Sequence, residues 1–234
     1  YALQLCRERK PLGILFLGGD LELFRARFQP ITVPCVLLTN TARDLHFENL
    51  SSLTTDDGEA AAQVIEFLAG QGHRRICLLG GNWSCSQISY RRLEGCRRAF
   101  QRLGLPFDPE RQCEPCRYSM PEAYAATERL LDRRPDLTAI FAMSDVMAIG
   151  AVRALRDRGT RVPEDIYVVG YDGIPMASYS VPRLSTVRQD TQRLAERGVD
   201  VLLRNIERKN CPVHEVVPFQ LIPCESVARL NGGA

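Results

Sequence analysis

The sequence predicts an α/β fold built on parallel sheets. Short apolar runs of strand length alternate along almost the whole chain with segments whose apolar residues recur at helical spacing. Most runs end at glycine or polar residues, as expected where a buried strand leaves a sheet. The clearest example is the stretch 138–190, in which the runs 139–142 and 166–169 end at the sequences MSD and GYDG. Alternation of this kind is typical of parallel sheets with right-handed crossovers.

The individual elements follow from apolar spacing and from their end signals. The segments expected as strands are 12–17, 35–38, 76–79, 139–142, 166–169, 184–187 and 213–222. The segments expected as helices are 54–72, 87–103, 119–133, 145–159 and 190–208. Among the helices, 119–133 has the strongest signal, because Ser119 and Glu122 form a capping box with Pro121 in the first turn.

Polar side chains follow two of the expected strands. Ser144 and Asp145 come after the run 139–142, and Asp172 comes after the run 166–169. Because parallel strands end at one edge of their sheet, these residues are expected at the edge where open α/β sheets bind ligands. Asp145 begins a helix, which favours a capping role. Asp172 is followed by glycine rather than by a helix, which favours contact with a ligand.

Length and composition describe an ordinary globular chain. The 234 residues are 45% hydrophobic, enough for one large or two smaller α/β domains. No apolar run reaches the roughly 18 residues of a membrane span, and the first residues lack a signal-peptide pattern, so no membrane partner is expected. The formal charge of +2 is too small to indicate nucleic-acid binding by this chain. Contact with DNA would need another segment.

Nine cysteines, an odd number, suit a reducing cytoplasm better than a disulfide framework. Cys113 and Cys116 could join Cys211 and His214 in a zinc site, but isolated CxxC spacings arise by chance and no metal is predicted. His73, at the end of a helix, is expected to cap carbonyl groups. The common cofactor, nucleophile and metalloprotease motifs are absent, so neither a cofactor nor an enzyme activity is predicted.

Several segments together resemble a known family. They are GHRRICLLGG (72–81), RRLEGCRRAF (91–100), TAIFAMSDVMAIGAVRAL (138–155), VPEDIYVVGYDGIPMASYSVPRLSTVRQD (162–190) and LIPCES (221–226). This ordered series is similar to the effector-binding core of the LacI/GalR-type transcription regulators. The resemblance implies two parallel-sheet subdomains of periplasmic-binding-protein type I, with a small molecule bound in the cleft between them.

The resemblance also implies how the chain is divided. An amino-terminal subdomain would contain residues 1–55 and 188–218, and a carboxyl-terminal subdomain would contain residues 56–187 and 219–234. The chain begins at what corresponds to the third strand of the first subdomain. The helix-turn-helix head, the hinge helix and the first strands have no counterpart here, so an open sheet edge is expected.

Candidate ligand contacts can be carried over position by position. Arg92 matches the family's arginine that grips hydroxyls or a carboxylate, and Asp172 matches its hydroxyl-binding aspartate. Tyr118 stands where an aromatic residue often stacks on the ligand, and Ser144 stands where many relatives have asparagine. Gln189 lies at a crossover between the subdomains. Thr39 and Asn40 stand where many relatives have an aspartate that contacts the ligand. Trp83 either contacts a sugar with its ring or packs against a helix.

The resemblance therefore implies the sensing portion of a cytoplasmic, homodimeric transcription regulator. A sugar-like effector would control operator binding through an amino-terminal helix-turn-helix that this chain lacks. The alternative is the solute-binding protein of a sugar transporter, which shares the fold and the cleft. A doubly wound enzyme is a third possibility, and turnover of a bound ligand would identify it.

Overall fold

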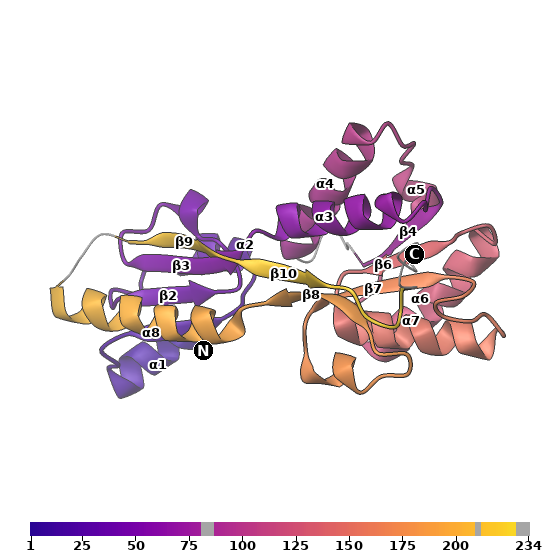
Figure 1. The fold of residues 1–234 in the computed structure, drawn as a ribbon. Helices are drawn as coiled ribbons and strands as arrows, with labels where there is room; N and C mark the ends of the chain where they lie inside the picture. The colour runs from indigo at the N-terminus through magenta and orange to yellow at the C-terminus, as the bar shows by residue number, and fades with distance from the viewer. Residues whose placement is uncertain (81–86, 209–211, 228–234) are drawn as a thin grey trace, which may run out of the picture. The chain divides into compact units, whose positions relative to one another are not determined.

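The computed structural model describes residues 1–80, 87–208 and 212–227. The chain forms two compact units, drawn in Figure 1. The first contains Tyr1–Asp56 and Asp190–Pro218, and the second contains Asp57–Gln189 and Phe219–Ala234. Within the described ranges, no helix is long and apolar enough to cross a bilayer.

The first unit contains a parallel sheet in the order β1-β2-β3-β9. Its strands are β1 (Ile14–Leu17), β2 (Cys35–Leu38), β3 (Leu50–Thr55) and β9 (His214–Val217). Its helices are α1 (Ala2–Arg9), α2 (Leu21–Arg27), the short η1 (Arg43–Leu45) and α8 (Thr191–Arg208). Alternating residues of β2 divide the core, because Cys35 and Leu37 pack with α2, whereas Val36 and Leu38 pack with α8.

Strand β1 is the edge of this sheet. Among the described residues no strand pairs with its outer side, and Leu17 at its end is 82% exposed. Within the described residues, β1 therefore ends the sheet on this side.

The second unit contains a sheet in the order β10-β8-β7-β6-β4-β5, in which only β10 is antiparallel. Its strands are β4 (Ile76–Leu79), β5 (Cys113–Glu114), β6 (Ala139–Ala142), β7 (Tyr167–Asp172), β8 (Ser185–Gln189) and β10 (Phe219–Ile222). Its helices are α3 (Asp57–Gly70), α4 (Gln87–Arg102), α5 (Pro109–Gln112), α6 (Met120–Arg133), α7 (Asp145–Asp157) and η2 (Pro175–Ser178).

Strand β4 shows how this sheet is buried on both faces. Ile76 and Leu78 pack in the cluster that contains α3 and α4, and Cys77 and Leu79 pack in the cluster that contains α6 and α7. All four residues have no exposed surface. An uninterrupted apolar run is the pattern of a parallel strand covered by helices on both sides, so the predicted α/β class with parallel sheets is confirmed.

Several boundaries differ from the sequence prediction. The segment 213–222 is not one strand, because β9 joins the first sheet and β10 the second, with Pro218 between them. The helix expected from residue 54 begins only at Asp57, since Leu50–Thr55 forms the buried strand β3. Helices α1 and α2 and the two-residue strand β5 were not predicted.

Candidate functional site

The carboxyl ends of β4, β6 and β7 meet at one edge of the second sheet, because these strands run parallel. Asp172 is the last residue of β7, and its φ of 111° lies in a region that residues with a side chain rarely adopt. Strain of this kind is concentrated at functional sites. This edge of the sheet is therefore a candidate ligand site.

Arg92, on α4, is the centre of the side-chain network at this edge. Only 4% of its surface is exposed. Its Nε donates to Oδ1 of Asp57 at 2.8 Å, and its Nη1 donates to the carbonyl oxygen of Met143. Although burial by itself lowers the pKa of Arg92, the charge of Asp57 and nearby groups raises that pKa above its ordinary value. The guanidinium is therefore charged and held in a fixed orientation.

Asp172 lies on the solvent side of Arg92. Its Oδ1 is 3.7 Å from Nη2 of Arg92, and Nε2 of Gln189 donates to the same oxygen at 2.9 Å. Burial raises the pKa of Asp172, while Arg92 and the Gln189 hydrogen bond act against that rise. The side chain is still 32% exposed. The structure thus brings three candidates, Arg92, Asp172 and Gln189, into one cluster.

Two further members of the network were missed by the sequence analysis. Tyr171 lies under the guanidinium, with Cζ of Arg92 3.5 Å from the ring centre, and its hydroxyl donates to Oδ1 of Asp57 at 3.0 Å. Asp57 is 5% exposed at the start of α3. The sequence TTDD looked like an ordinary helix start, which hid the role of Asp57 as the main partner of Arg92.

Tyr118 and Ser144 lie close to the same edge in different roles. Tyr118 is 42% exposed, and its hydroxyl is 2.7 Å from Oγ of Ser89, one turn before Arg92 on α4. Ser144 is 1% exposed, and its Oγ accepts the backbone N–H of Met147, which makes it the N-cap of α7. An exposed aromatic ring suits ligand contact, whereas Ser144 is engaged in capping.

The capping role predicted for Asp145 is wrong, because Ser144 provides the cap. Asp145 instead accepts hydrogen bonds from Oγ1 of Thr186 at 2.6 Å and from the backbone N–H of Ile174 at 2.8 Å. Burial raises its pKa to about 6. Asp145 thus ties α7 to β8 and to the loop that follows Asp172.

Thr39 and Asn40 belong to the first unit, at the end of β2. Thr39 has a φ of 68° and donates its backbone N–H to the carbonyl of Leu53. Asn40 is 2% exposed, and its side chain bonds both Gly19 O and the N–H of Thr41. Trp83, the remaining candidate, falls outside the described residues.

His73 and the cysteines complete the earlier candidates. The backbone N–H of His73 donates to the carbonyl of Leu68 at the end of α3, whereas its ring contacts Oγ1 of Thr138. The side chain that bonds a carbonyl of α3 is that of Arg74, which donates to Ala69. Cys113 and Cys116 are buried free thiols, and burial raises their pKa values to about 12 and about 11. Cys211 lies outside the described residues; within those residues, no group of three or more His, Cys, Asp or Glu side chains could hold a metal.

The cluster around Arg92 can recognise a polar small molecule. A fixed guanidinium donates hydrogen bonds in a fork, and the exposed part of Asp172 accepts them from hydroxyl groups. Oδ2 of Asp172 has no hydrogen-bond partner among the residues that the structure describes. This combination of one cation, one anion and one amide is suited to binding rather than to a specific chemical step.

Comparisons with known proteins agree with this description. A family model described as "Periplasmic binding protein-like domain" matches residues 65–227. The HTH-type transcriptional regulator MalR of Clostridium butyricum is 32% identical over 94% of this chain and 66% of its own length. The probable HTH-type transcriptional repressor ExuR of Bacillus subtilis is 31% identical over 93% of this chain and 65% of its own. These relatives are named as transcription regulators and not as enzymes.

Solved structures give the same result. The transcriptional regulator CelR in complex with cellobiose has a TM-score of 0.87 and 29% identity, and the match covers 96% of this chain and 68% of that one. A LacI family regulator of Enterococcus faecium with bound ribose has a TM-score of 0.84 and 26% identity, covering 99% and 85%. The chain spans somewhat less than two thirds of the length of MalR and ExuR. The chain therefore belongs to the periplasmic binding protein-like domain family, in the form found in LacI-family transcription regulators.

Proposed function

We propose that this chain is the effector-sensing part of a cytoplasmic, DNA-binding transcription regulator that responds to a sugar-like small molecule. The observation that carries the proposal is the cluster of Arg92, Asp172 and Gln189 at the carboxyl edge of the second sheet. Its groups match the donors and acceptors of a polyhydroxyl compound. Relatives solved with cellobiose and ribose support this class of ligand.

In the proposed mechanism the two units are the amino- and carboxyl-terminal subdomains. Effector bound at the Arg92 cluster favours the arrangement of the units for which it has the higher affinity. A change in that arrangement is passed to a helix-turn-helix outside this chain and alters operator binding. The names of the relatives favour a regulator over the alternative, a solute-binding protein of a transporter.

The proposed regulator is a homodimer, as a two-fold operator would require. Met176, Tyr179 and Val181 of the second unit support this, because they are large apolar residues with 51%, 84% and 79% of their surface exposed. Replacing Tyr179 and Val181 by glutamate is expected to shift the full-length protein from dimer to monomer in sedimentation velocity. A monomer without these changes would contradict this part of the proposal.

The test of ligand binding is isothermal titration of the full-length protein with cellobiose, ribose, other sugars, nucleosides and sugar phosphates. Arg92→Ala and Asp172→Ala are each expected to weaken the binding of the recognised compound by more than about 2 kcal/mol. Because Arg92 is buried, Asp172→Asn is the variant that tests affinity with the least effect on folding. Asp200→Ala, an exposed change in the first unit, is the control.

Three outcomes would contradict the proposal. If no compound of these classes binds the intact protein, the sugar-sensing proposal is lost. If a compound binds but Asp172→Asn and Arg92→Ala leave its affinity unchanged, the site is elsewhere. If the effector binds normally and has no influence on DNA binding in a gel-shift assay, the chain senses a ligand for another purpose.

A further inference from the structure

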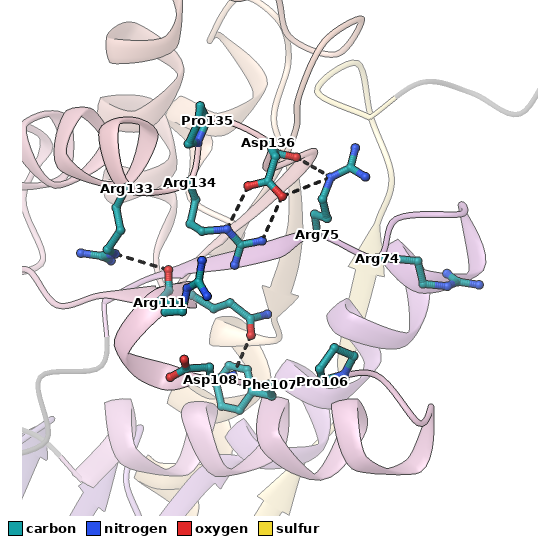
Figure 2. A pocket seen from close by; sticks show the side chains of 11 residues that line it. Arg74, Arg75, Pro106, Phe107, Asp108, Arg111, Arg133, Arg134, Pro135 and Asp136 are labelled. Atoms are coloured by element: carbon teal, nitrogen blue, oxygen red, sulfur yellow. Dashed lines mark hydrogen bonds and ion pairs between the residues drawn. The ribbon is translucent and has the colours of Figure 1, made fainter.

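The second unit has a hollow at the amino-terminal edge of its sheet, the edge away from Arg92. Its volume is about 570 Å³. It is formed by the residues before β4, the loop that leads into α5, α5 itself, and the turn between α6 and β6 (Figure 2). Two aspartates line it together with five arginines, which are Arg74, Arg75, Arg111, Arg133 and Arg134. The hollow therefore carries a clear excess of positive charge.

Arg133 and Arg74 make hydrogen bonds that join neighbouring elements of the second unit. Arg133 donates from Nη1 to Glu114 at 2.7 Å and from Nη2 to the carbonyl of Cys113 at 2.9 Å. Arg74 donates to the carbonyl of Ala69 at the end of α3. They hold the walls of the hollow together, and their hydrogen-bonding capacity is partly used.

The side chains of Arg75 and Arg134 both contact Asp136, and Nε of Arg75 also donates to the backbone carbonyl of Asp136. Asp136 lies between the side chains of Arg75 and Arg134 in Figure 2. Its Oδ1 is 2.9 Å from Nε of Arg134, and its Oδ2 is 3.7 Å from Nε of Arg75. The guanidinium of Arg111 has no hydrogen-bond or ion-pair partner among the described residues. Asp136 and Asp108 thus balance only part of the charge of the five guanidinium groups that line the hollow.

The floor of the hollow is held in place by Gln112, which is 5% exposed. Its Nε2 donates to the carbonyl of Ile76, and its Oε1 accepts the backbone N–H of Asp108. The Phe107 ring stacks on Phe100 with a centroid distance of 4.7 Å. The loop that forms one wall is therefore anchored to β4 and to α4 without any ligand.

We propose that this hollow is a second binding site, which takes a small phosphate-bearing molecule through Arg75, Arg111 and Arg134. Its volume falls within the range of small-molecule sites, roughly 300–1,000 Å³. A phosphate has more oxygens than a carboxylate and can accept from several guanidinium forks at once. Asp136 competes with the ligand for Arg75 and Arg134. The inference does not depend on the proposed sugar site, because it rests on other residues.

The probe is inorganic pyrophosphate, titrated into the protein at constant ionic strength, with sulfate as the control anion. Arg111→Ala is expected to weaken pyrophosphate binding about tenfold, and it should not disturb folding because Arg111 has no partner to lose. Asp136→Asn is expected to strengthen binding, because it removes the competing charge and keeps the side-chain shape. Arg98→Ala is the matched control, since Arg98 is an exposed arginine of α4 outside the hollow.

Amide chemical shifts locate the binding. Pyrophosphate should move the amide signals of Arg75, Arg111 and Asp136 and leave those of Asp172 and Gln189 in place. The proposal is overturned if pyrophosphate does not bind, if it binds no better than sulfate, or if Arg111→Ala and Arg98→Ala bind it alike. Binding of an acidic peptide without binding of pyrophosphate would also overturn it and would indicate a protein contact at this edge.

Discussion

The guanidinium carbon of Arg92 lies 3.5 Å from the centre of the Tyr171 ring. The hydroxyl of the same tyrosine and Nε of the arginine both donate to Oδ1 of Asp57. Three side chains, from α3, α4 and β7, thus form a closed buried group. A buried cation is costly unless it is fully paired, so this group fixes the orientation in which Nη2 faces Asp172.

The contribution of the Tyr171 hydroxyl can be measured with Tyr171→Phe. The variant keeps the ring beneath the guanidinium and removes one hydrogen bond to a buried carboxylate. We expect the free energy of unfolding to fall by about 1–2 kcal/mol in urea denaturation. Tyr90→Phe, at a position that is 49% exposed, should leave it unchanged. Equal stabilities of the two variants would show that the hydroxyl contributes nothing.

The fold was largely readable from the sequence because parallel strands leave a strong local signal. The run 139–142 was predicted with the bounds of β6. Both faces of this strand are buried, so all four of its residues are apolar. The strand β3 was missed because four of the six residues in its sequence, LSSLTT, have hydroxyl side chains. The buried hydroxyls of Ser51 and Ser52 bond the side chains of Asn205 and His214, which lie far along the chain. Local patterns do not contain such long-range partners.

The candidate site was only partly readable, for a related reason. Arg92 and Asp172 could be named from their motifs, but Asp57 is 35 residues before Arg92 and follows a stretch that looks like a helix cap. Asp145 was expected to cap α7 and Ser144 to contact the ligand, but Ser144 caps the helix and Asp145 bonds Thr186 and Ile174. Which of two adjacent polar residues caps a helix depends on whether the other finds a partner, here Thr186 on β8.

Asp145 makes stability depend on pH. Its folded-state pKa is about 6, above its ordinary value of 3.8, so the folded state holds the proton more tightly than the unfolded state. This group therefore lowers the free energy of unfolding as pH rises from about 4 to about 6, by up to about 3 kcal/mol. Above that window its contribution is constant.

The measurement is urea denaturation of the wild type and Asp145→Asn at several pH values between 4 and 7. The variant lacks the titrating group. As pH rises through this window, the free energy of unfolding of the wild type should therefore fall relative to that of the variant. Parallel profiles would mean that the carboxylate is as well stabilised by Thr186 and Ile174 in the fold as it is by water.

Ser226 anchors the end of the described chain. Its Oγ donates to the carbonyl of Val168 at 2.5 Å and accepts the N–H of Ser185 at 2.8 Å, and the residue is fully buried. Ser226→Ala leaves both backbone groups without this partner, and we expect a loss of about 2 kcal/mol in the free energy of unfolding. Ser180→Ala, whose hydroxyl bonds only local carbonyls, should cost less. The opposite order would contradict the anchoring role.

The close approach of α3 and α4 positions Arg92 and permits no side chain at Gly95. A Cβ atom there would lie 2.0 Å from the carbonyl oxygen of Gly58, which directly follows Asp57. Gly95→Ala must therefore push the two helices apart, and we expect it to cost about 3 kcal/mol of stability. Gly70→Ala, at the end of α3 with nothing within 4 Å of the added atom, should instead stabilise the protein by about 0.5 kcal/mol.

The displacement of the helices in Gly95→Ala also separates Asp57 from Arg92. Gly95→Ala should therefore weaken effector binding, whereas Gly70→Ala should not. Stability and affinity that are unaltered in Gly95→Ala would show that the helices adjust without moving the arginine.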